Sequence, residues 1–298
     1  MVRLRGMLAD LGIETKENLL LAPYSSFRIG GRARLGCFPK SSDELVKALQ
    51  LAIRTDTPYL VIGNASNVVF ADAGFDGVVI FTGGCKHVEI RENRIFAEAG
   101  ATLMSIALAA KEASLSGMEF AYGIPGTLGG AVFMNAGAFG GCMADVCVAS
   151  AYFDAACGEI RCTEGSAQAF ANRSSIYTHA PGFTVLRAEL CLQAGVKDEI
   201  EARMRDFMTR RRTTQPLDLP SAGSVFKRPA GHFAGKLIEE CGLKGRRIGG
   251  AEVSEKHAGF IVNRGGATAQ DVKELVALIR ACVRQETGVD LECEIRFL

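Results

Sequence analysis

Two short segments of the sequence combine residue types that can hold or transfer a proton. In the first, Gly223 precedes Ser224, and Lys227 follows three positions later. A glycine before a serine predicts a bend that presents the hydroxyl group, although the pattern is also typical of a serine turn or a helix cap. The second segment, residues 292–297, alternates charged and apolar side chains. In a strand its charged residues share one face, which either reaches a cleft or protects an exposed edge.

An arginine in a polar and aromatic setting offers a third kind of chemistry. Arg173 follows Phe170 and precedes two serines and Tyr177. A guanidinium group in a cleft binds a carboxylate through two parallel hydrogen bonds. From the spacing alone, however, a surface arginine on a loop is the favoured interpretation.

Glycine is concentrated in residues 122–141, YGIPGTLGGAVFMNAGAFGG, which carry almost no charge. Glycine is tolerated at such density where the backbone must approach another group closely or take a positive φ. Asn135 adds an amide that both donates and accepts hydrogen bonds. A second turn, GNASN at residues 63–67, offers further main-chain N–H groups of the kind that bind pyrophosphate. Both segments predict a flat or phosphate-bearing ligand, and a glycine-rich turn packed under a sheet is the alternative.

The elements that position these residues follow from periodicity and capping. Apolar residues at helical spacing, with caps such as Ser41 and Thr268, predict several amphipathic helices, and short apolar or alternating runs predict strands. Their mixture, without a regular βαβ alternation, predicts an α+β fold. The helices are expected at residues 41–54, 102–114, 197–213, 233–241 and 271–286, and the strands at 59–62, 78–81, 87–97, 145–153, 158–163, 184–193, 260–262 and 292–297.

Composition narrows the class of protein. The 298 residues, 48 % of them hydrophobic and 22 % charged, are enough for two or three domains. A net charge of +1 gives no field for nucleic acid or an anionic membrane, and we expect neither as a partner. The ten cysteines form no C-x-x-C pair and no zinc pattern, so we expect no metal, free thiols packed as small core residues, and a reducing cytoplasm. No P-loop or G-x-G-x-x-G motif occurs.

Taken in order along the chain, these segments resemble the UDP-N-acetylenolpyruvoylglucosamine reductase (MurB) family. The resemblance spans nearly the whole sequence. Within the family, this chain is similar to the shorter type, which lacks a tyrosine-bearing loop. It is carried by residues 24–31, 63–67, 123–141, 173–175, 223–227, 237–245, 257–263 and 291–296.

The resemblance implies an FAD-binding fold of the vanillyl-alcohol-oxidase type with a C-terminal α+β substrate-binding domain. It divides the chain into a first FAD-binding subdomain at residues 1–70, completed by the C-terminal strand 290–298, a second at 71–212, and a substrate domain at 213–289. The implied reaction is NADPH-dependent and FAD-mediated reduction of UDP-N-acetylglucosamine enolpyruvate to UDP-N-acetylmuramate, in peptidoglycan precursor synthesis. A monomer that acts on small molecules is expected.

The family pattern also implies roles for individual residues. Arg173 and Glu294 would stabilise an enolate, and Ser224 would protonate its carbon. Lys227 and Asn263 would contact substrate. FAD would be held by Gly63, Asn64, Ala65, Ser66, Asn67, Gly123, Ile124, Pro125, Gly126, Gly129, Gly130, Ala131 and Asn135.

Three positions depart from the family pattern. Asn172 stands where tyrosine is common, Ala65 where glycine is usual, and Gly259 where asparagine is common. None removes a catalytic group, so we expect an active enzyme. Two alternatives remain, namely another FAD enzyme of the same fold and a non-catalytic flavin-binding or nucleotide-sugar-binding regulator. The presence of all three proposed catalytic residues argues against both.

Overall fold

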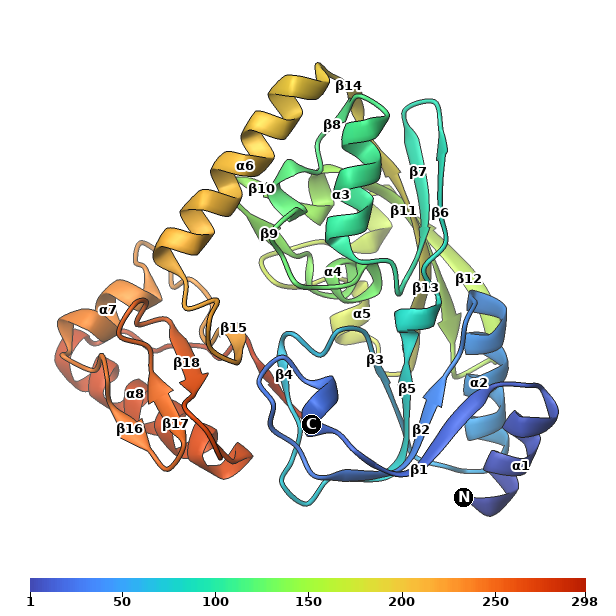
Figure 1. Ribbon diagram of the computed structural model, residues 1–298, viewed down its shortest axis with the longest axis horizontal. Helices are drawn as coiled ribbons and strands as arrows, with labels where there is room; N and C mark the ends of the chain where they lie inside the picture. The colour runs from blue at the N-terminus through green and yellow to red at the C-terminus, as the bar shows by residue number, and fades with distance from the viewer. The chain divides into compact units, whose positions relative to one another are not determined.

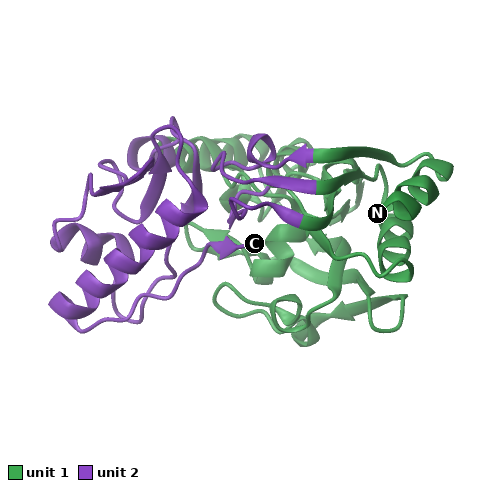
Figure 2. Cartoon of the chain, turned by 90° about the horizontal axis from the view of Figure 1, so that it is seen from below, with its two compact units in different colours: residues 1–18, 34–64, 76–209 green, residues 19–33, 65–75, 210–298 purple.

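A computed structural model describes residues 1–298 and divides them into two compact units. Unit 1 comprises residues 1–18, 34–64 and 76–209, and unit 2 comprises residues 19–33, 65–75 and 210–298. Figure 2 shows that several strands begin in one unit and end in the other. The last boundary, at residue 209, lies close to the expected one at 212, but residues 19–33 and 65–75 join unit 2. The expected division into three domains stays a prediction.

The first sheet has four strands in the order β1-β2-β5-β3, where β3 and β5 run parallel (Figure 1). Helix α2 begins after Ser41, whose hydroxyl accepts the main-chain N–H of Glu44 at 3.2 Å, as its sequence predicts. Leu45, Leu49 and other apolar residues of α2 are buried in a core that also receives α1. The elements are α1 (Val2–Asp10), β1 (Glu14–Leu20), β2 (Arg32–Phe38), α2 (Ser42–Arg54), β3 (Tyr59–Ile62) and β5 (Phe75–Phe81).

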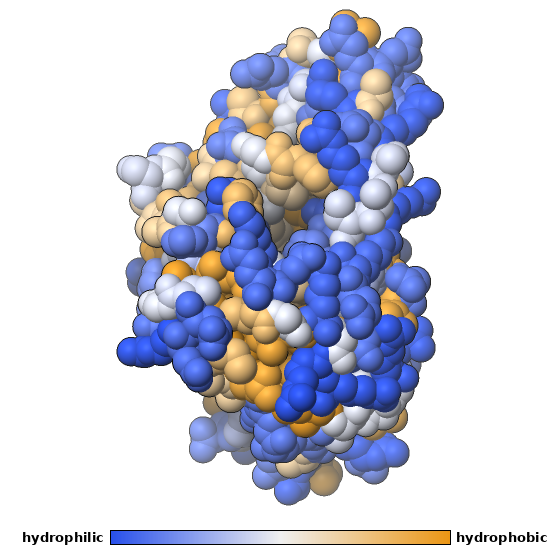
Figure 3. Space-filling view, turned by 90° about the vertical axis from the view of Figure 1, so that its left-hand side faces the viewer, coloured by the Kyte–Doolittle hydropathy of each residue, from blue (hydrophilic) through white to orange (hydrophobic).

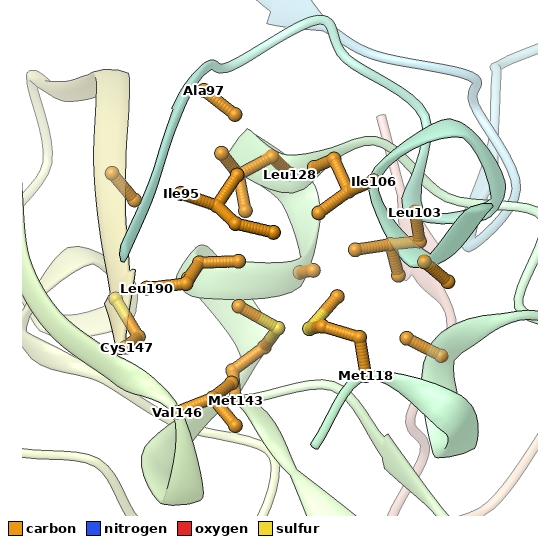
Figure 4. Close-up of a cluster of buried hydrophobic side chains, with 14 of the residues drawn as sticks. Ile95, Ala97, Leu103, Ile106, Met118, Leu128, Met143, Val146, Cys147 and Leu190 are labelled. Carbon is orange, nitrogen blue, oxygen red and sulfur yellow. The ribbon is translucent and has the colours of Figure 1, made fainter. Parts of the chain in front are cut away.

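The second sheet lies in unit 1 and has five antiparallel strands in the order β12-β11-β13-β7-β6. Side chains from this sheet, from α3 and from α4 meet in one buried cluster, where Ile95, Leu128 and Leu190 point toward one another (Figure 4). The cluster places the glycine-rich residues 122–141 directly against the sheet. The strands are β6 (Val88–Arg91), β7 (Arg94–Glu98), β11 (Cys147–Asp154), β12 (Glu159–Glu164) and β13 (Phe183–Cys191), and the helices are α3 (Leu103–Glu112), α4 (Leu128–Met134), α5 (Ile176–His179) and α6 (Lys197–Thr214).

Unit 2 has a sheet in the order β15-β18-β17-β16, with α7 and α8 packed beside it. Its core joins all three of its chain segments, since Phe27, Val69 and Val272 belong to one buried cluster. The C-terminal strand β19 pairs in parallel with β4. The elements are β4 (Val68–Val69), β15 (Ser221–Ser224), α7 (Ala234–Glu240), β16 (Arg247–Ile248), β17 (Ala251–Val253), β18 (Phe260–Asn263), α8 (Ala269–Thr287) and β19 (Arg296–Phe297).

The remaining strands are two-residue pairs in unit 1. They are β8 (Leu115–Ser116) with β14 (Gln193–Ala194), and β9 (Gly137–Ala138) with β10 (Gly141–Cys142). No helix is long and apolar enough to cross a membrane. On the face drawn in Figure 3, hydrophilic residues predominate and smaller hydrophobic areas lie between them.

Most predicted elements are present, and two predictions are wrong. The expected strand at residues 292–297 is regular only at β19, and before it Cys293 makes a single isolated bridge to Phe226. The ten cysteines are free, but only Cys37, Cys85 and Cys147 are buried. Burial raises the pKa of each of these three thiols to about 12, so they remain neutral core groups.

Candidate active site

The glycine-rich residues 122–141 contain helix α4, which their composition conceals. A Cβ atom on Gly129 would lie 2.8 Å from the Cβ of Ala99, so this glycine allows the helix to approach a neighbouring segment. A Cβ atom on Gly130 would meet nothing nearer than 3.8 Å, and this residue is exposed. Close packing therefore explains Gly129, whereas Gly130 leaves an open stretch of backbone.

The start of the turn at residues 63–67 meets the glycine-rich segment within unit 1. A Cβ atom on Gly63 would lie 2.2 Å from the Thr127 hydroxyl oxygen, which shows how closely the Thr127 side chain approaches the Gly63 backbone. The Asn64 side-chain amide donates to the carbonyl of Pro125 at 3.2 Å. Asn64 and Pro125 are both exposed, like Gly130. Exposed residues from the two segments thus lie close together in unit 1, in a part of the chain with few large side chains, which fits a large flat ligand with phosphate groups.

Arg173 stands at the tip of a tight turn in unit 1. Ala171 and Ser174 exchange two main-chain hydrogen bonds, of 3.0 and 3.2 Å, across this turn. Arg173 has φ of 54°, which is unfavourable for a residue with a long side chain. Its Nη2 donates to the carbonyl of Gly137 in β9 at 3.2 Å. A strained arginine held by its surroundings is typical of functional sites, and this supports the anion-binding interpretation.

Asn135 caps the C-terminus of α4 with φ of 48°. Its amide nitrogen donates to the carbonyl of Ala171 at 2.9 Å, and its amide oxygen accepts the N–H of Ala144 at 2.9 Å. The side chain is 8 % exposed. The polar atoms of Asn135 therefore bind main-chain groups of unit 1, and contact of this residue with a cofactor stays a prediction.

In unit 2, the serine and the C-terminal glutamate lie on neighbouring segments. Ser224 ends β15 and follows Gly223, whose φ of 79° confirms the expected bend. The N–H of Glu294 donates to the carbonyl of Val225 at 2.7 Å, and the N–H of Lys227 donates to the carbonyl of Glu292 at 2.9 Å. These bonds run residues 225–227 antiparallel to residues 292–294, so the segment that follows Ser224 lies beside the segment that contains Glu294.

Residues 65–67 lie beside the segment that contains Glu294, to which Asn67 is hydrogen-bonded. The Asn67 side-chain amide donates to the carbonyl of Glu294 at 3.1 Å, and the N–H of Arg296 donates to the carbonyl of Asn67 at 3.0 Å. Ala65 has φ of 45°, so the position where the family has glycine does require a left-handed backbone. The turn GNASN is thus divided, with Gly63 and Asn64 in unit 1 and the other three residues in unit 2.

The two residues expected at the substrate both have partners within unit 2. Lys227 forms an ion pair of 2.5 Å with Glu292 and keeps a quarter of its side chain exposed. Asn263 is 7 % exposed, and its amide nitrogen donates to the carbonyl of Phe27 at 3.0 Å. Its amide oxygen accepts two further main-chain N–H groups. Substrate contact by either residue stays a prediction, and Asn263 also holds the backbone of unit 2 together.

A buried polar network beneath the arginine turn was missed by the sequence analysis. The Ser150 hydroxyl lies 2.7 Å from the Tyr177 hydroxyl and 2.8 Å from the side-chain oxygen of Gln168, which also accepts from the Cys147 thiol. Burial raises the pKa of Tyr177, so the network stays neutral. The aromatic residue four positions after Arg173 was its only signal in the sequence.

The position of Gly259 explains one departure from the family pattern. A Cβ atom on Gly259 would lie 2.9 Å from Cε1 of His257, whose Nδ1 accepts the Gly259 N–H at 3.1 Å. Burial lowers the pKa of His257 and keeps the ring neutral, as this accepted bond requires. With His257 in this orientation, asparagine does not fit at 259. Asn172 is exposed beside Arg173, and nothing in the structure explains it.

The predicted residues divide between the units. Unit 1 holds Arg173, Gly63, Asn64, Gly123, Ile124, Pro125, Gly126, Gly129, Gly130, Ala131 and Asn135. Unit 2 holds Ser224, Glu294, Lys227, Asn263, Ala65, Ser66 and Asn67.

Two family models match the sequence. Residues 34–163 match an FAD binding domain, and residues 215–298 match the UDP-N-acetylenolpyruvoylglucosamine reductase, C-terminal domain. The second match begins at residue 215, close to the expected start of the substrate domain at residue 213.

Relatives with the name UDP-N-acetylenolpyruvoylglucosamine reductase cover almost the whole chain. The protein of Lactobacillus helveticus is 43 % identical over 98 % of this chain and 97 % of its own length. That of Caldicellulosiruptor bescii is 45 % identical over 98 % and 93 %.

Solved structures agree with these relatives. The structure of UDP-N-acetylenolpyruvylglucosamine reductase from Thermus caldophilus has a TM-score of 0.81 and 36 % identity, and the match covers 96 % of this chain and 98 % of that one. Berberine bridge enzyme from Eschscholzia californica shares 16 % identity over 65 % of this chain and 44 % of its own, with a TM-score of 0.50, which is a likeness of fold alone.

Proposed function

This chain belongs to the UDP-N-acetylenolpyruvoylglucosamine reductase family, and we propose that it reduces UDP-N-acetylglucosamine enolpyruvate to UDP-N-acetylmuramate with electrons from NADPH. As a family member it is a flavin-dependent oxidoreductase, and its cofactor is FAD. The expected family, the α+β fold with an FAD-binding domain, and the cofactor are confirmed. The electron donor, the residue roles and the cytoplasmic location belong to the proposal.

One observation in unit 2 carries the proposed chemistry. Ser224 and Glu294 are held on adjacent antiparallel segments by a 2.7 Å main-chain bond between Glu294 and Val225. The segment that carries the hydroxyl group and the segment that carries the carboxylate are therefore held side by side by main-chain hydrogen bonds. Fixed geometry of this kind favours proton transfer, because the reacting groups do not have to be ordered during the reaction.

The reduction needs one hydride and one proton at the two carbons of the enolpyruvyl double bond. FAD, once reduced by NADPH, would supply the hydride to the terminal carbon, and NADPH would leave as NADP⁺. Ser224 Oγ–H gives the proton to the adjacent carbon, where negative charge collects, and the serine oxygen then regains a proton from solvent. A serine hydroxyl is a weak acid in water, but an enolate carbon is a strong base, so position matters more than pKa.

Charge on the substrate requires a cation that is already in place. The guanidinium group of Arg173 binds the substrate carboxylate and the developing enolate oxygen, and Glu294 holds the arrangement. Preorganised groups of this kind typically lower a barrier by about 3–4 kcal/mol each. The left-handed backbone of Arg173 supports this role, since strain is retained where geometry serves function.

The residues of both glycine turns suit FAD. Gly130 and its neighbours in unit 1 present main chain without side chains, which suits a flat ring system and its pyrophosphate. In unit 2, residues 65–67 are proposed to bind FAD through their main-chain groups. Lys227 and Asn263 are proposed to contact the substrate.

Anaerobic absorption spectroscopy of the purified protein tests the proposal. A limiting amount of NADPH should bleach the yellow of the flavin, and UDP-N-acetylglucosamine enolpyruvate should then restore it. UDP-N-acetylglucosamine, which lacks the double bond, serves as the matched control and should restore nothing. Colour that returns with neither compound would mean that the electron acceptor is a different substrate.

A further inference from the structure

The end of helix α4 is fastened to the arginine turn through side chains from both sides. Ser175 follows the turn, and its hydroxyl donates to the carbonyl of Phe133 at 2.7 Å. Asn135 donates to the carbonyl of Ala171, which opens the turn, at 2.9 Å. The Arg173 side chain itself donates to a carbonyl of β9, two residues beyond Asn135. The glycine-rich segment and the arginine turn thus behave as one structural piece of unit 1.

Asn135 occupies the centre of this connection. Its φ of 48° is a conformation that glycine adopts without strain and asparagine tolerates. Glycine could therefore adopt the same backbone conformation, and the feature that asparagine adds is its side-chain amide. That amide joins Ala144 on one side to Ala171 on the other, with both bonds at 2.9 Å.

We propose that Asn135 is a positioning residue that sets the orientation of Arg173 by holding the carbonyl of Ala171. The carbonyl of Ala171 accepts a second bond, from the N–H of Ser174, which closes the turn around Arg173. Loss of the amide leaves the turn with one anchor fewer on the side that faces α4. This role differs from the cofactor contact expected from the sequence, and it rests on the function proposed for Arg173.

The same argument links the cofactor to the substrate anion. Residues 122–134, which are proposed to hold FAD, are followed directly by Asn135. The turn that contains Arg173 begins at Ala171, whose carbonyl group accepts the hydrogen bond from Asn135. One backbone segment therefore fixes both the proposed flavin surface and the cation for the enolate. Asn135 is 8 % exposed, and both hydrogen bonds of its amide go to main-chain groups.

The test uses two variants and a matched control in the FAD-loaded protein. Asn135→Gly keeps the left-handed backbone and removes the amide, and Asn135→Asp keeps the acceptor for Ala144 and removes the donor to Ala171. Asn18→Gly makes the same replacement at an exposed residue with φ of 49° in β1. Hydrogen exchange of the peptide that spans residues 170–176 is measured by mass spectrometry, and the two half-reactions are followed separately.

Exchange of the peptide 170–176, which contains the Ser174 amide, should become at least fivefold faster in both Asn135 variants and stay unchanged in Asn18→Gly. Reoxidation of the reduced flavin by substrate should slow about tenfold with a raised KM for the enolpyruvate, while reduction by NADPH changes less than twofold. Unchanged exchange, or equal loss of both half-reactions with weaker FAD binding, would overturn the positioning role. If the unmodified protein fails to reduce the substrate, the proposed function falls, and hydrogen exchange alone decides whether Asn135 orders the turn.

Discussion

Adjacent glycines in helix α4 should respond oppositely to the same substitution. Gly130→Ala places a methyl group in open space on a helix, whereas Gly129→Ala drives one to within 2.8 Å of the Ala99 side chain. Only the second change requires the neighbouring segment to move. The pair therefore separates a glycine needed for packing from a glycine proposed to leave room for FAD.

The magnitudes follow from these two surroundings. Alanine stabilises a helix relative to glycine by about 0.5–1 kcal/mol, so Gly130→Ala should raise the melting temperature of the FAD-free protein by about 2 °C. Overpacking typically costs about 1–3 kcal/mol, so Gly129→Ala should lower it by several degrees. If FAD lies on the open backbone at Gly130, the added methyl should weaken FAD binding at least tenfold.

Two measurements check the pair. Thermal unfolding of the FAD-free proteins gives the stability changes, and titration with FAD, followed by flavin fluorescence, gives the affinities. A Gly130→Ala variant that is more stable but binds FAD poorly is the expected outcome. Unaltered FAD affinity in that variant would refute the assignment of this surface to the cofactor, and a stable Gly129→Ala variant would refute the packing argument.

Three further substitutions test other parts of the account. Ser224→Ala should leave reduction of the flavin by NADPH nearly intact and slow its reoxidation by substrate at least a hundredfold. Ser221→Ala, at the start of the same strand, should slow neither half-reaction. Equal slowing of both half-reactions by Ser224→Ala would remove the proton-donor role. Glu294→Gln should slow reoxidation by a factor on the order of 100, and Glu292→Gln less than threefold in steady-state assays; the reverse result would move the catalytic role to Glu292. Asp271 lies in the first turn of α8, and its carboxylate accepts the main-chain N–H groups of Gly250 and Thr268. Asp271→Ala removes this acceptor and should cost about 1 kcal/mol of unfolding free energy at neutral pH. Because those bonds lower the pKa of Asp271 below its ordinary 3.8, this difference should be complete above that value and shrink as the pH falls through the lowered folded-state pKa, which denaturation at pH 7 and pH 3 would show.

Helices with strong local signals could be predicted from the sequence. The helix expected at residues 271–286 is α8, because Thr268 and Asp271 form a capping box that needs no distant partner. Helix α4 was not predicted, because two adjacent glycines argue against a helix and only the contact with Ala99 favours small residues there. Long-range packing, which a local pattern does not show, therefore explains the glycine at this position of the helix.

The candidate site divides in the same way. The bend at Gly223 was predicted from residue types, and the φ of 79° at Gly223 agrees with it, whereas the role expected of the turn at residues 63–67 stays a prediction. The strand at residues 292–297 was wrong because alternation alone does not supply a partner strand, and only an isolated bridge and β19 provide pairing. The partner of Asn135 lies 36 residues away along the chain, a contact that no local pattern reveals.

The threading of the chain through two units also has a consequence for synthesis on the ribosome. Phe27 and Val69 are made early, yet the core that buries them needs side chains of residues 210–298. At about 5–20 residues per second, these apolar groups wait roughly 10–55 s for the end of the chain. Unit 2 is therefore the part of the nascent chain in which chaperone binding should be concentrated, and a ribosome stalled before the last helix should expose a fragment that proteases degrade.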